Sequence, residues 1–527
     1  MIRVFSLFAL VGAAALGQDK PGTTARPSLS GAELIDSHIE AKWKANGIKP
    51  AKAAEDYEFL RRAWLDICGV IPPADEVARY LKDDRKNKES MLVDTLIATE
   101  RYAEYFAEFW EAILIGYDYG VKNDSKDALY YWLRDEAFSK NLPYDEMVRR
   151  LINSKGSNQT QGNTVFLWRQ LRNGGGVVEI TGKIARSFMG TQIQCAQCHD
   201  HPFDRYTQED FYGVASFFTR VRPKKVQPQN QQDQEFELYE DARGEITIPE
   251  AKDRKPVPPK FLDGAVPTKD EPRRQAFGRI LTRKENLQFA MSAVNRYWGH
   301  FFGRGIVHPV EEFNDKNKPS HPELLKELAQ DFIDHKYDLK WLVRTIATSK
   351  TYQLSSSMSK KDAPDPKFFA CAPVRMMTPE QLFNSLMEAT GAEDLFRLQE
   401  KKTGGFNEVR GQKTQILRQF RFTFGDDEST DIADFAGTIP QALLFLNGEL
   451  MQRGVTQQNG RLDLILRTRK NLGERLDLMF MSALGRHPNN KDLQRFVPFI
   501  QKKNEDRVAF EDVYWTLLNT TEFMFIH

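Results

Sequence analysis

Cysteine is scarce in this chain, and the scarcity excludes one class of protein at once. The sequence has 527 residues and only 4 cysteines. Small exported proteins held together by disulfides carry far more for their length, so no disulfide framework is expected. Neither sign of charge is in excess, because 74 lysines and arginines face 73 aspartates and glutamates. A whole-chain attraction to nucleic acid or to an anionic membrane is therefore excluded.

Long apolar runs are also missing, with one short exception near the start. Residues 4–16 are apolar, follow Arg3, and lead to small residues at Ala15 and Gly17. Such a run is too short to span a bilayer comfortably, and its pattern is typical of a secretory signal. We predict a signal peptide over 1–17 and a flexible lead-in over 18–30. The mature protein is then exported, periplasmic or extracellular, without an integral membrane span; an uncleaved anchor is the alternative.

Two of the four cysteines lie together, in the segment Cys195-Ala196-Gln197-Cys198-His199. This C-x-x-C-H pattern is that of covalent c-type haem attachment. The two thiols would add to the haem vinyl groups, and His199 would be the proximal iron ligand. With so few cysteines, and 9 histidines in the whole chain, a chance match is improbable. The sequence therefore predicts one covalent haem c, held by Cys195, Cys198 and His199, and export agrees with this site.

The same residues leave two other kinds of site open. A four-coordinate zinc or iron site could use Cys195, Cys198, either His199 or His201, and Asp204, because zinc accepts sulfur, nitrogen and oxygen ligands. A disulfide between the two cysteines is the other possibility, although the βαβ pattern of a thioredoxin-like site is absent.

The surroundings of a haem are only partly predictable. Apolar walls are expected from aromatic residues that follow the motif, namely Phe203, Tyr206, Phe211, Tyr212, Phe217 and Phe218. No pattern identifies the distal iron ligand, for which Met189, His300, His308 and His321 are candidates. A methionine ligand would raise the reduction potential, and an open position would permit small-molecule chemistry.

Helical periodicity dominates the chain, so we predict a mainly α fold with two helical domains and a small irregular or β insert between them. The first domain is predicted over 31–220 and carries the motif. Residues 221–275 form the linker, in which 235–239 and 245–248 alternate and predict a β-hairpin. The second domain is predicted over 276–527.

Three helix starts are expected from capping patterns, at Thr207, Ser320 and Thr378. The aromatic residues of 105–135 predict core packing, with a carbohydrate platform as the alternative. The acidic residues of 426–434 predict a solvated loop rather than a calcium site, because their spacing is not that of an EF-hand.

A weak repeat joins the two ends of the chain. Gly69-x-x-Pro72 has a counterpart in Gly485-x-x-Pro488, and the segments 96–102 and 517–523 are similar, with a third relative at 346–352. We predict a helix–turn–helix–helix module of about 50 residues near both ends, a size typical of helical repeats. Chance recurrence of helix-capping patterns is the alternative. Because Cys68 aligns with Leu484, a buried apolar thiol is expected there.

Several of these segments resemble a known pair of families. Residues 59–62, the turn Gly69-x-x-Pro72-Pro73, and the runs 192–204 and 207–213 resemble a secreted planctomycete cytochrome-like domain of unknown function, numbered fifteen-forty-nine. Residues 295–305, 320–325 and 351–353 resemble its companion domain, fifteen-fifty-three. The resemblance covers nearly all of the mature chain and implies an exported bacterial protein with a cytochrome-c-like site, but no known reaction.

Two departures from this family matter. Larger relatives add an N-terminal cytochrome domain with its own C-x-x-C-H, and many carry a Cys-x-Cys-Glu-Arg segment where this chain has Gly425-Asp426-Asp427-Glu428. A second redox or metal site in that region is therefore not expected here.

We therefore expect an exported haem-c protein that acts as an electron-transfer or redox module for an unknown extracytoplasmic partner. The alternative is a non-haem binding module stabilised by metal or disulfide, or a glycan-associated hydrolase. No pair of carboxylates has a spacing that identifies an acid–base couple.

Overall fold

The computed structural model describes residues 31–116, 126–172, 176–201, 204–226, 235–249, 254–359, 363–392 and 454–527, together with Leu29 and Ala251. The predicted signal peptide, Phe203 and the acidic segment 426–434 lie outside the described residues.

Helices make up most of the described chain, which confirms the predicted mainly α class. The N-terminal part contains α1 (Ala32–Asn46), α2 (Asp56–Cys68), α3 (Ala74–Leu81), α4 (Lys88–Ile97), α5 (Glu100–Ile115), α6 (Lys126–Tyr131), α7 (Tyr144–Ile152), α8 (Thr164–Arg172), α9 (Val177–Ile184) and α10 (Gln208–Ala215). Two π-helical turns, η1 (Trp132–Phe138) and η2 (Ala185–Met189), and the 3₁₀ turn η3 (Gln194–Gln197) lie among them.

The later part of the chain is built in the same way. It contains α11 (Arg273–Leu281), α12 (Leu287–Phe302), α13 (Pro322–Asp334), α14 (Leu339–Ala347), the 3₁₀ turn η4 (Pro366–Phe368), α15 (Pro379–Thr390), α20 (Arg461–Thr468), α21 (Leu472–Leu484), α22 (Asn490–Lys502), α23 (Arg507–Leu518) and α24 (Thr521–Met524). No helix of the described residues is long and apolar enough to cross a membrane.

Two small antiparallel sheets accompany the helices. The first has the order β1-β3-β2, from Gly156–Ser157, Phe236–Glu240 and Val221–Lys225, and the second pairs β4 (Arg375–Met376) with β5 (Phe525–Ile526). The predicted hairpin between 235–239 and 245–248 is wrong in its pairing. The first strand exists as β3, but it pairs with β1 and β2, while Thr247 only bridges Pro256. The buried side chains of β3 must cover the helical core, and that requirement selects the pairing.

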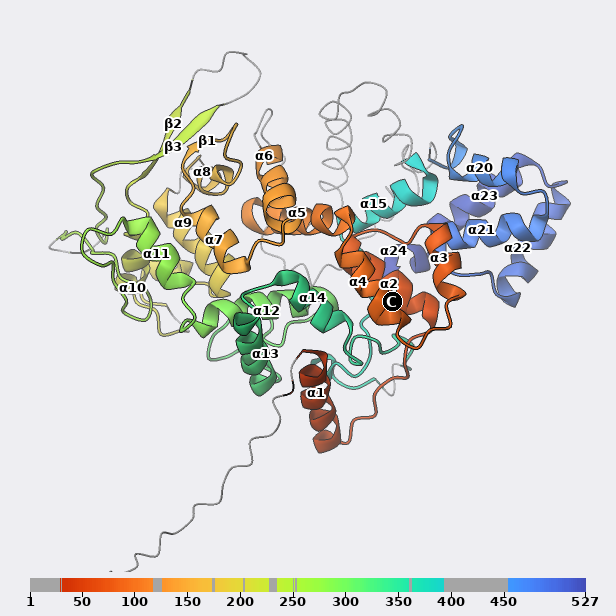
Figure 1. The fold of residues 1–527 in the computed structure, drawn as a ribbon, viewed down its shortest axis with the longest axis horizontal. Helices are drawn as coiled ribbons and strands as arrows, with labels where there is room; N and C mark the ends of the chain where they lie inside the picture. Colours follow the sequence, from red (N-terminus) through yellow and green to blue (C-terminus); the bar gives the residue numbers. More distant parts are fainter. Residues whose placement is uncertain are drawn as a thin grey trace, which may run out of the picture.

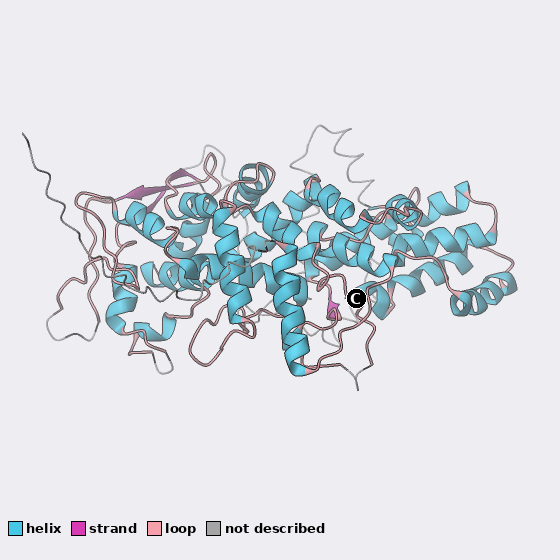
Figure 2. Cartoon of the chain, turned by 60° about the horizontal axis from the view of Figure 1, so that its bottom comes forward, coloured by secondary structure: helices cyan, strands magenta, loops and turns pink. Residues whose placement is uncertain are grey.

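The described helices form an elongated body, with the β1-β3-β2 sheet near one end and α20–α23 at the other (Figures 1 and 2). One apolar core takes its residues from Leu34 to Ala370, together with Met481, and includes helices on both sides of the insert, such as α10 and α11. A second core joins α15 and α20–α24 with Leu65 and Ile71 of the N-terminal part. The division into two domains stays a prediction, since the first core continues across the insert.

The helix order that the repeat predicts is present in both of its main copies. Helices α2 and α21 have equal lengths, and each ends at a glycine in the left-handed region, Gly69 at φ 65° and Gly485 at φ 71°. Two further helices follow in each copy, α3 and α4 in one and α22 and α23 in the other. Thr99 and Thr520 then cap the next helices by accepting a backbone N–H three residues on. We call residues 56–102 the first module and residues 472–523 the second module.

The modules contact each other through a buried arginine. Arg61 of α2 donates to the carbonyl oxygens of Ala483, Glu522 and Phe523, at 3.2, 3.2 and 2.7 Å. The expected burial of Cys68 is also confirmed, because its side chain is 2% exposed and burial raises its pKa to about 12.

The capping predictions had mixed outcomes. Thr207 and Thr378 each form the complete reciprocal box with the residue three positions later. Ser320 does not cap α13, which begins at Pro322 after His321 with no side-chain cap. Ser320 donates instead to the carbonyl of Ile306 at 3.2 Å, so its hydroxyl holds the preceding loop. The aromatic residues of 105–135 that the structure describes lie in or against the core, as Trp110 and Tyr130 do.

Candidate functional site

The cysteines of the C-x-x-C-H segment lie on and directly after a short surface turn. A left-handed glycine, Gly190 at φ 61°, ends η2, and the 3₁₀ turn η3 follows at Gln194–Gln197. Ala196 is fully buried and anchors the turn, whereas Cys195, Cys198 and His199 are exposed. Both cysteines are free thiols. The structure therefore presents all three predicted haem-attachment residues at the surface of the protein.

The ring orientation of His199 suits a metal ligand. Its Nδ1 lies 2.7 Å from the backbone oxygen of Asp200, and a carbonyl oxygen can only accept, so Nδ1 carries the proton. In a neutral imidazole the lone pair is then on Nε2. Iron- and zinc-binding histidines almost always donate their other N–H to a carbonyl or carboxylate in this way. The donor set of two exposed thiols and one oriented imidazole fits a covalent haem.

Residues of helix α10 are hydrogen-bonded to the motif and to the residue that follows it. The backbone oxygen of Gln197 accepts hydrogen bonds from Gln208 Nε2 at 3.2 Å and from the Tyr212 hydroxyl at 3.3 Å. Asp200 Oδ1 accepts from the Gln208 backbone N–H at 3.0 Å. The pKa of Tyr212 is raised, mainly by burial and further by Cys198. The capping box at Thr207 thus places the start of α10 where it bonds the motif on both sides of Cys198.

The predicted aromatic wall is only partly present. Tyr206 and Tyr212 are buried beside the motif, and the backbone oxygen of Tyr206 accepts from the backbone N–H of His201 at 2.8 Å. Phe217 and Phe218 instead pack edge-on against Phe277 of α11, with ring centroids 5.3 and 4.9 Å away. Together with Phe211, they are fully buried parts of the core, and both follow the end of α10 at Ala215. Phe203 lies outside the described residues.

Three of the four candidates for the distal iron ligand, namely Met189, His300 and His321, are buried in the protein. His300 Nε2 bonds the backbone oxygen of Asp66 at 2.8 Å, and burial lowers the pKa of His300 to about 4. His321 is buried against the ring of Phe369, and its pKa is also lowered to about 4 by burial. Met189 is buried at the end of η2. The choice of distal ligand stays open.

A cavity of about 290 Å³ adjoins the loop that follows the motif. It is lined by Thr191, Asp204, Arg205, Tyr206, Gln288, Val307, Phe313, Asn314, Asp315, Asn317 and Pro319. His308, the partly buried distal candidate, directly follows Val307. No local pattern in the sequence indicates that residues 307–319 belong to this site, because they lie more than a hundred positions from the motif.

Three contacts hold the 306–319 loop and α12 against the segment before the motif. Phe313 N–H donates to Gly190 O at 2.8 Å, and Gln288 Nε2 donates to Met189 O at 2.8 Å. Gln192 Nε2 donates to Glu312 Oε1 at 3.4 Å. A side chain at position 190 would collide with the Phe313 ring, so the glycine allows this close approach. The surroundings of the motif are therefore shared between distant parts of the chain.

The structure does not assemble the rival ligand set. No group of three or more His, Cys, Asp and Glu side chains among the described residues is placed to hold a metal ion. Asp204 Oδ1 accepts from the neighbouring Arg205 N–H at 2.8 Å. A zinc or iron site that includes His201 and Asp204 stays a prediction.

Two family models match the chain. Residues 34–223 match PSCyt2, a protein of unknown function (DUF1549), and residues 273–500 match PSD1, a protein of unknown function (DUF1553). The chain belongs to this two-domain family. The order of the two matches and their positions confirm the resemblance that the motifs indicated. No curated protein and no solved structure is significantly similar to the chain.

The motif lies inside the PSCyt2 match, whereas the 306–319 loop belongs to the PSD1 match. The cavity beside the motif is therefore lined by both members of the family pair.

Proposed function

We propose that this protein binds one haem c covalently and acts as an exported electron-transfer or redox module. Cys195 and Cys198 would form the two thioether bonds, and His199 would bind the iron through Nε2. The observation that carries this proposal is the bond from His199 Nδ1 to the Asp200 carbonyl, next to two exposed free thiols. A bound haem would supply an iron that accepts and releases single electrons.

The chain's own residues would prepare the site. The Asp200 carbonyl fixes the imidazole tautomer, and the bonds from α10 to Gln197 fix the turn between the cysteines. The exposure of the motif lets an extracytoplasmic partner approach it. The apolar stretch of residues 4–16 supports export, which covalent haem attachment in bacteria requires. The redox partner belongs to this proposal and has no assigned identity.

The proposal is tested by producing the chain together with a c-type maturation system. We expect a red protein whose intact mass exceeds that of the polypeptide by one haem. Cys195→Ser with Cys198→Ser should remove the covalent haem. Cys371→Ser is the matched control, because this half-buried cysteine lies outside the motif, and it should leave the haem in place. A colourless protein with the mass of the bare polypeptide would refute the proposal.

A further inference from the structure

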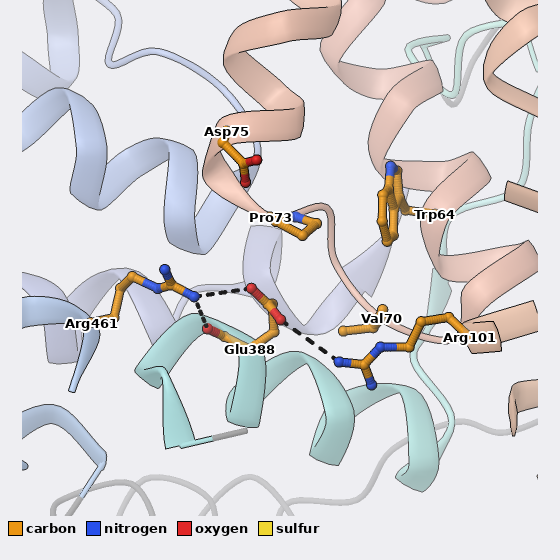
Figure 3. A pocket seen from close by; sticks show the side chains of 7 residues that line it. All are labelled: Trp64, Val70, Pro73, Asp75, Arg101, Glu388 and Arg461. Atoms are coloured by element: carbon orange, nitrogen blue, oxygen red, sulfur yellow. Dashed lines mark hydrogen bonds and ion pairs between the residues drawn. The ribbon is translucent and has the colours of Figure 1, made fainter. Parts of the chain in front are cut away.

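A cavity of about 310 Å³ beside the first module is lined by charges that are compensated within the protein. Figure 3 shows the Glu388 carboxylate between Arg101 and Arg461, whose nitrogens lie 4.0 and 3.1 Å from it. Arg101 also pairs with Glu104 at 3.9 Å, and Asp75 pairs with an arginine on the next turn of α3 at 3.1 Å. These contacts join α15 and α20 to the first module, and they identify no ligand.

The cavity of about 290 Å³ beside the loop that follows the motif has a different lining, and we call it the loop cavity. The charged residues that line it or belong to the adjoining 306–319 loop are Asp204, Arg205, Glu311, Glu312, Asp315, Lys316 and Lys318. Glu311 is compensated by Arg186 and Arg296, at 3.3 and 2.9 Å. The other six are three carboxylates and three cations, so the surroundings favour a neutral ligand over an ion.

Three amide side chains line the loop cavity, and each is held by the protein at one end. Gln288 Nε2 donates to the backbone oxygen of Met189 at 2.8 Å, which leaves Oε1 as an acceptor. Asn317 Nδ2 donates to the backbone oxygen and the carboxylate of Glu312, at 3.2 and 3.0 Å, which leaves Oδ1 as an acceptor. Asn314 Oδ1 accepts from two backbone N–H groups of its own loop, at 2.9 and 3.0 Å, which leaves Nδ2 as a donor. These free ends have no partner among the described residues and are accessible, so the cavity offers two fixed acceptors and one fixed donor.

The 204–206 segment adds an aromatic ring and further hydrogen-bonding groups. The Arg205 guanidinium lies over the Tyr206 ring, 5.6 Å from its centroid, and has no carboxylate partner among the described residues. Asp204 Oδ1 accepts from the Arg205 N–H at 2.8 Å, which leaves Oδ2 as an acceptor, and the Tyr206 hydroxyl can donate or accept. A second ring comes from Phe313, whose N–H donates to Gly190 O at 2.8 Å. The lining thus combines two rings with donors and acceptors in similar number.

Hydroxyl groups match such a lining, because each of them donates one hydrogen bond and accepts others. The free donors and acceptors come from segments 204–206, 288 and 314–317, so a ligand needs several hydroxyls that point in different directions. An apolar face of the same ligand can pack on the rings of Tyr206 and Phe313. A neutral sugar ring combines these features, because it carries hydroxyls around its edge, C–H groups on its faces and no charge.

We propose that the loop cavity binds one neutral hexopyranose ring, whose hydroxyls bond the three amides, Asp204 and Arg205. A free sugar and a unit of a glycan share this chemistry. The volume is near the lower end of the range for small-molecule sites, roughly 300–1,000 Å³, and so fits a single ring. Asp204 and Arg205 lie in the PSCyt2 match and the three amides in the PSD1 match, so the sugar would contact both members of the family pair. This binding site goes beyond the proposed redox function and is independent of haem attachment.

Saturation-transfer NMR of the full chain tests the proposal, with D-glucose, D-galactose and D-mannose as probes. At least one of these sugars should receive saturation at its ring protons, and cyclohexanol, a ring of the same size with one hydroxyl, should not. D-Glucuronate and D-galacturonate should bind no more tightly than the matching neutral sugars. The methyl glycosides of the sugars that bind identify the source, because equal binding indicates a unit within a glycan and loss of binding indicates a free monosaccharide.

Variants of the 204–206 segment give a second readout, by NMR titration with the sugar that binds. Arg205→Gln and Asp204→Asn should each weaken binding about tenfold or more, because each removes a hydrogen bond to a charged group. Arg243→Gln and Asp241→Asn are the matched controls and should leave the affinity unchanged, because Asp241 Oδ1 likewise accepts from the Arg243 N–H, at 3.1 Å, outside the cavity. All four variants should keep the circular dichroism spectrum of the original chain. Absence of saturation transfer to all three sugars, equal transfer to cyclohexanol, tighter binding of the uronates, or unchanged affinity of either cavity variant would overturn the proposal.

Discussion

The buried charge of Asp66 offers the sharpest test of how the N- and C-terminal parts are held together. Asp66 lies on α2 and is fully buried, where its carboxylate accepts from the Tyr352 hydroxyl at 2.7 Å and from Arg375 Nη2. Arg375 lies on β4 and is largely buried, with a side-chain exposure of 15%. Asp66→Asn keeps the shape of the side chain and removes the charge that compensates Arg375.

Removing one partner of a buried ion pair typically costs about 3–5 kcal/mol, because the other charge is left in the interior without compensation. We therefore expect Asp66→Asn to lower the free energy of unfolding at pH 7 by about that amount. The double variant Asp66→Asn with Arg375→Met removes both charges and should recover most of the loss. Denaturant unfolding followed by circular dichroism measures both effects.

The exposed pair of Asp94 and Arg344 is the matched control, since both side chains are nearly half exposed. Asp94→Asn should cost no more than about 1 kcal/mol, because solvent screens surface ion pairs. If Asp66→Asn costs as little as Asp94→Asn, the buried pair does not hold the two parts together and the reasoning fails.

Three further predictions follow from burial and backbone geometry. Burial lowers the pKa of His300 to about 4, so the unfolded chain binds this proton first as pH falls. The contribution of His300 to the free energy of unfolding should be complete above about pH 6.5 and should fall by about 2 kcal/mol by pH 5. His300→Gln should remove this part of the pH dependence, as denaturant unfolding at several pH values would show. A pH dependence that the substitution leaves unchanged would contradict this prediction. Because Cys68 is buried and its pKa is raised to about 12, maleimide at pH 7.5 should label the exposed Cys195 of the haem-free chain and should not label Cys68 until the chain unfolds. Peptide masses measure both reactions, and equal labelling of the two cysteines would contradict the burial of Cys68. Gly69→Ala should lower the free energy of unfolding by about 2 kcal/mol or more beyond the effect of Gly47→Ala, with a correspondingly lower melting temperature. Equal effects of the two substitutions would contradict the structure. Both glycines have φ near 65°, but a Cβ at Gly69 would lie 2.1 Å from a tyrosine ring, and nothing lies within 4 Å at Gly47.

Patterns that are local in the sequence predicted the structure well. Helix periodicity, the Gly-x-x-Pro turns of the two modules and the Thr207 and Thr378 boxes depend on residues a few positions apart, so a single sequence contains them. Alignment of the two modules predicted that Cys68 is buried, because its counterpart is a leucine. The C-x-x-C-H segment is local as well, and the structure places its cysteines and histidine at the surface, whereas haem attachment stays a prediction.

Features that depend on distant residues were missed. The strand β3 pairs with β2 and β1, although its own alternation pointed equally to a neighbouring hairpin. Phe217 and Phe218 were expected beside a haem, but both follow the end of α10 and pack against Phe277 of α11 in the core. Arg101, Glu388 and Arg461 meet in one cavity from three distant segments, and no spacing rule relates such positions.

The central claim is covalent haem at Cys195 and Cys198, and one measurement tests it most directly. Trypsin cleaves after Arg186 and Arg205, which releases residues 187–205 with the whole motif. In protein exported by cells with c-type maturation, this peptide should carry the mass of one haem, and both cysteines should resist alkylation. The same peptide recovered without haem, with its cysteines free or joined to each other, would contradict the account.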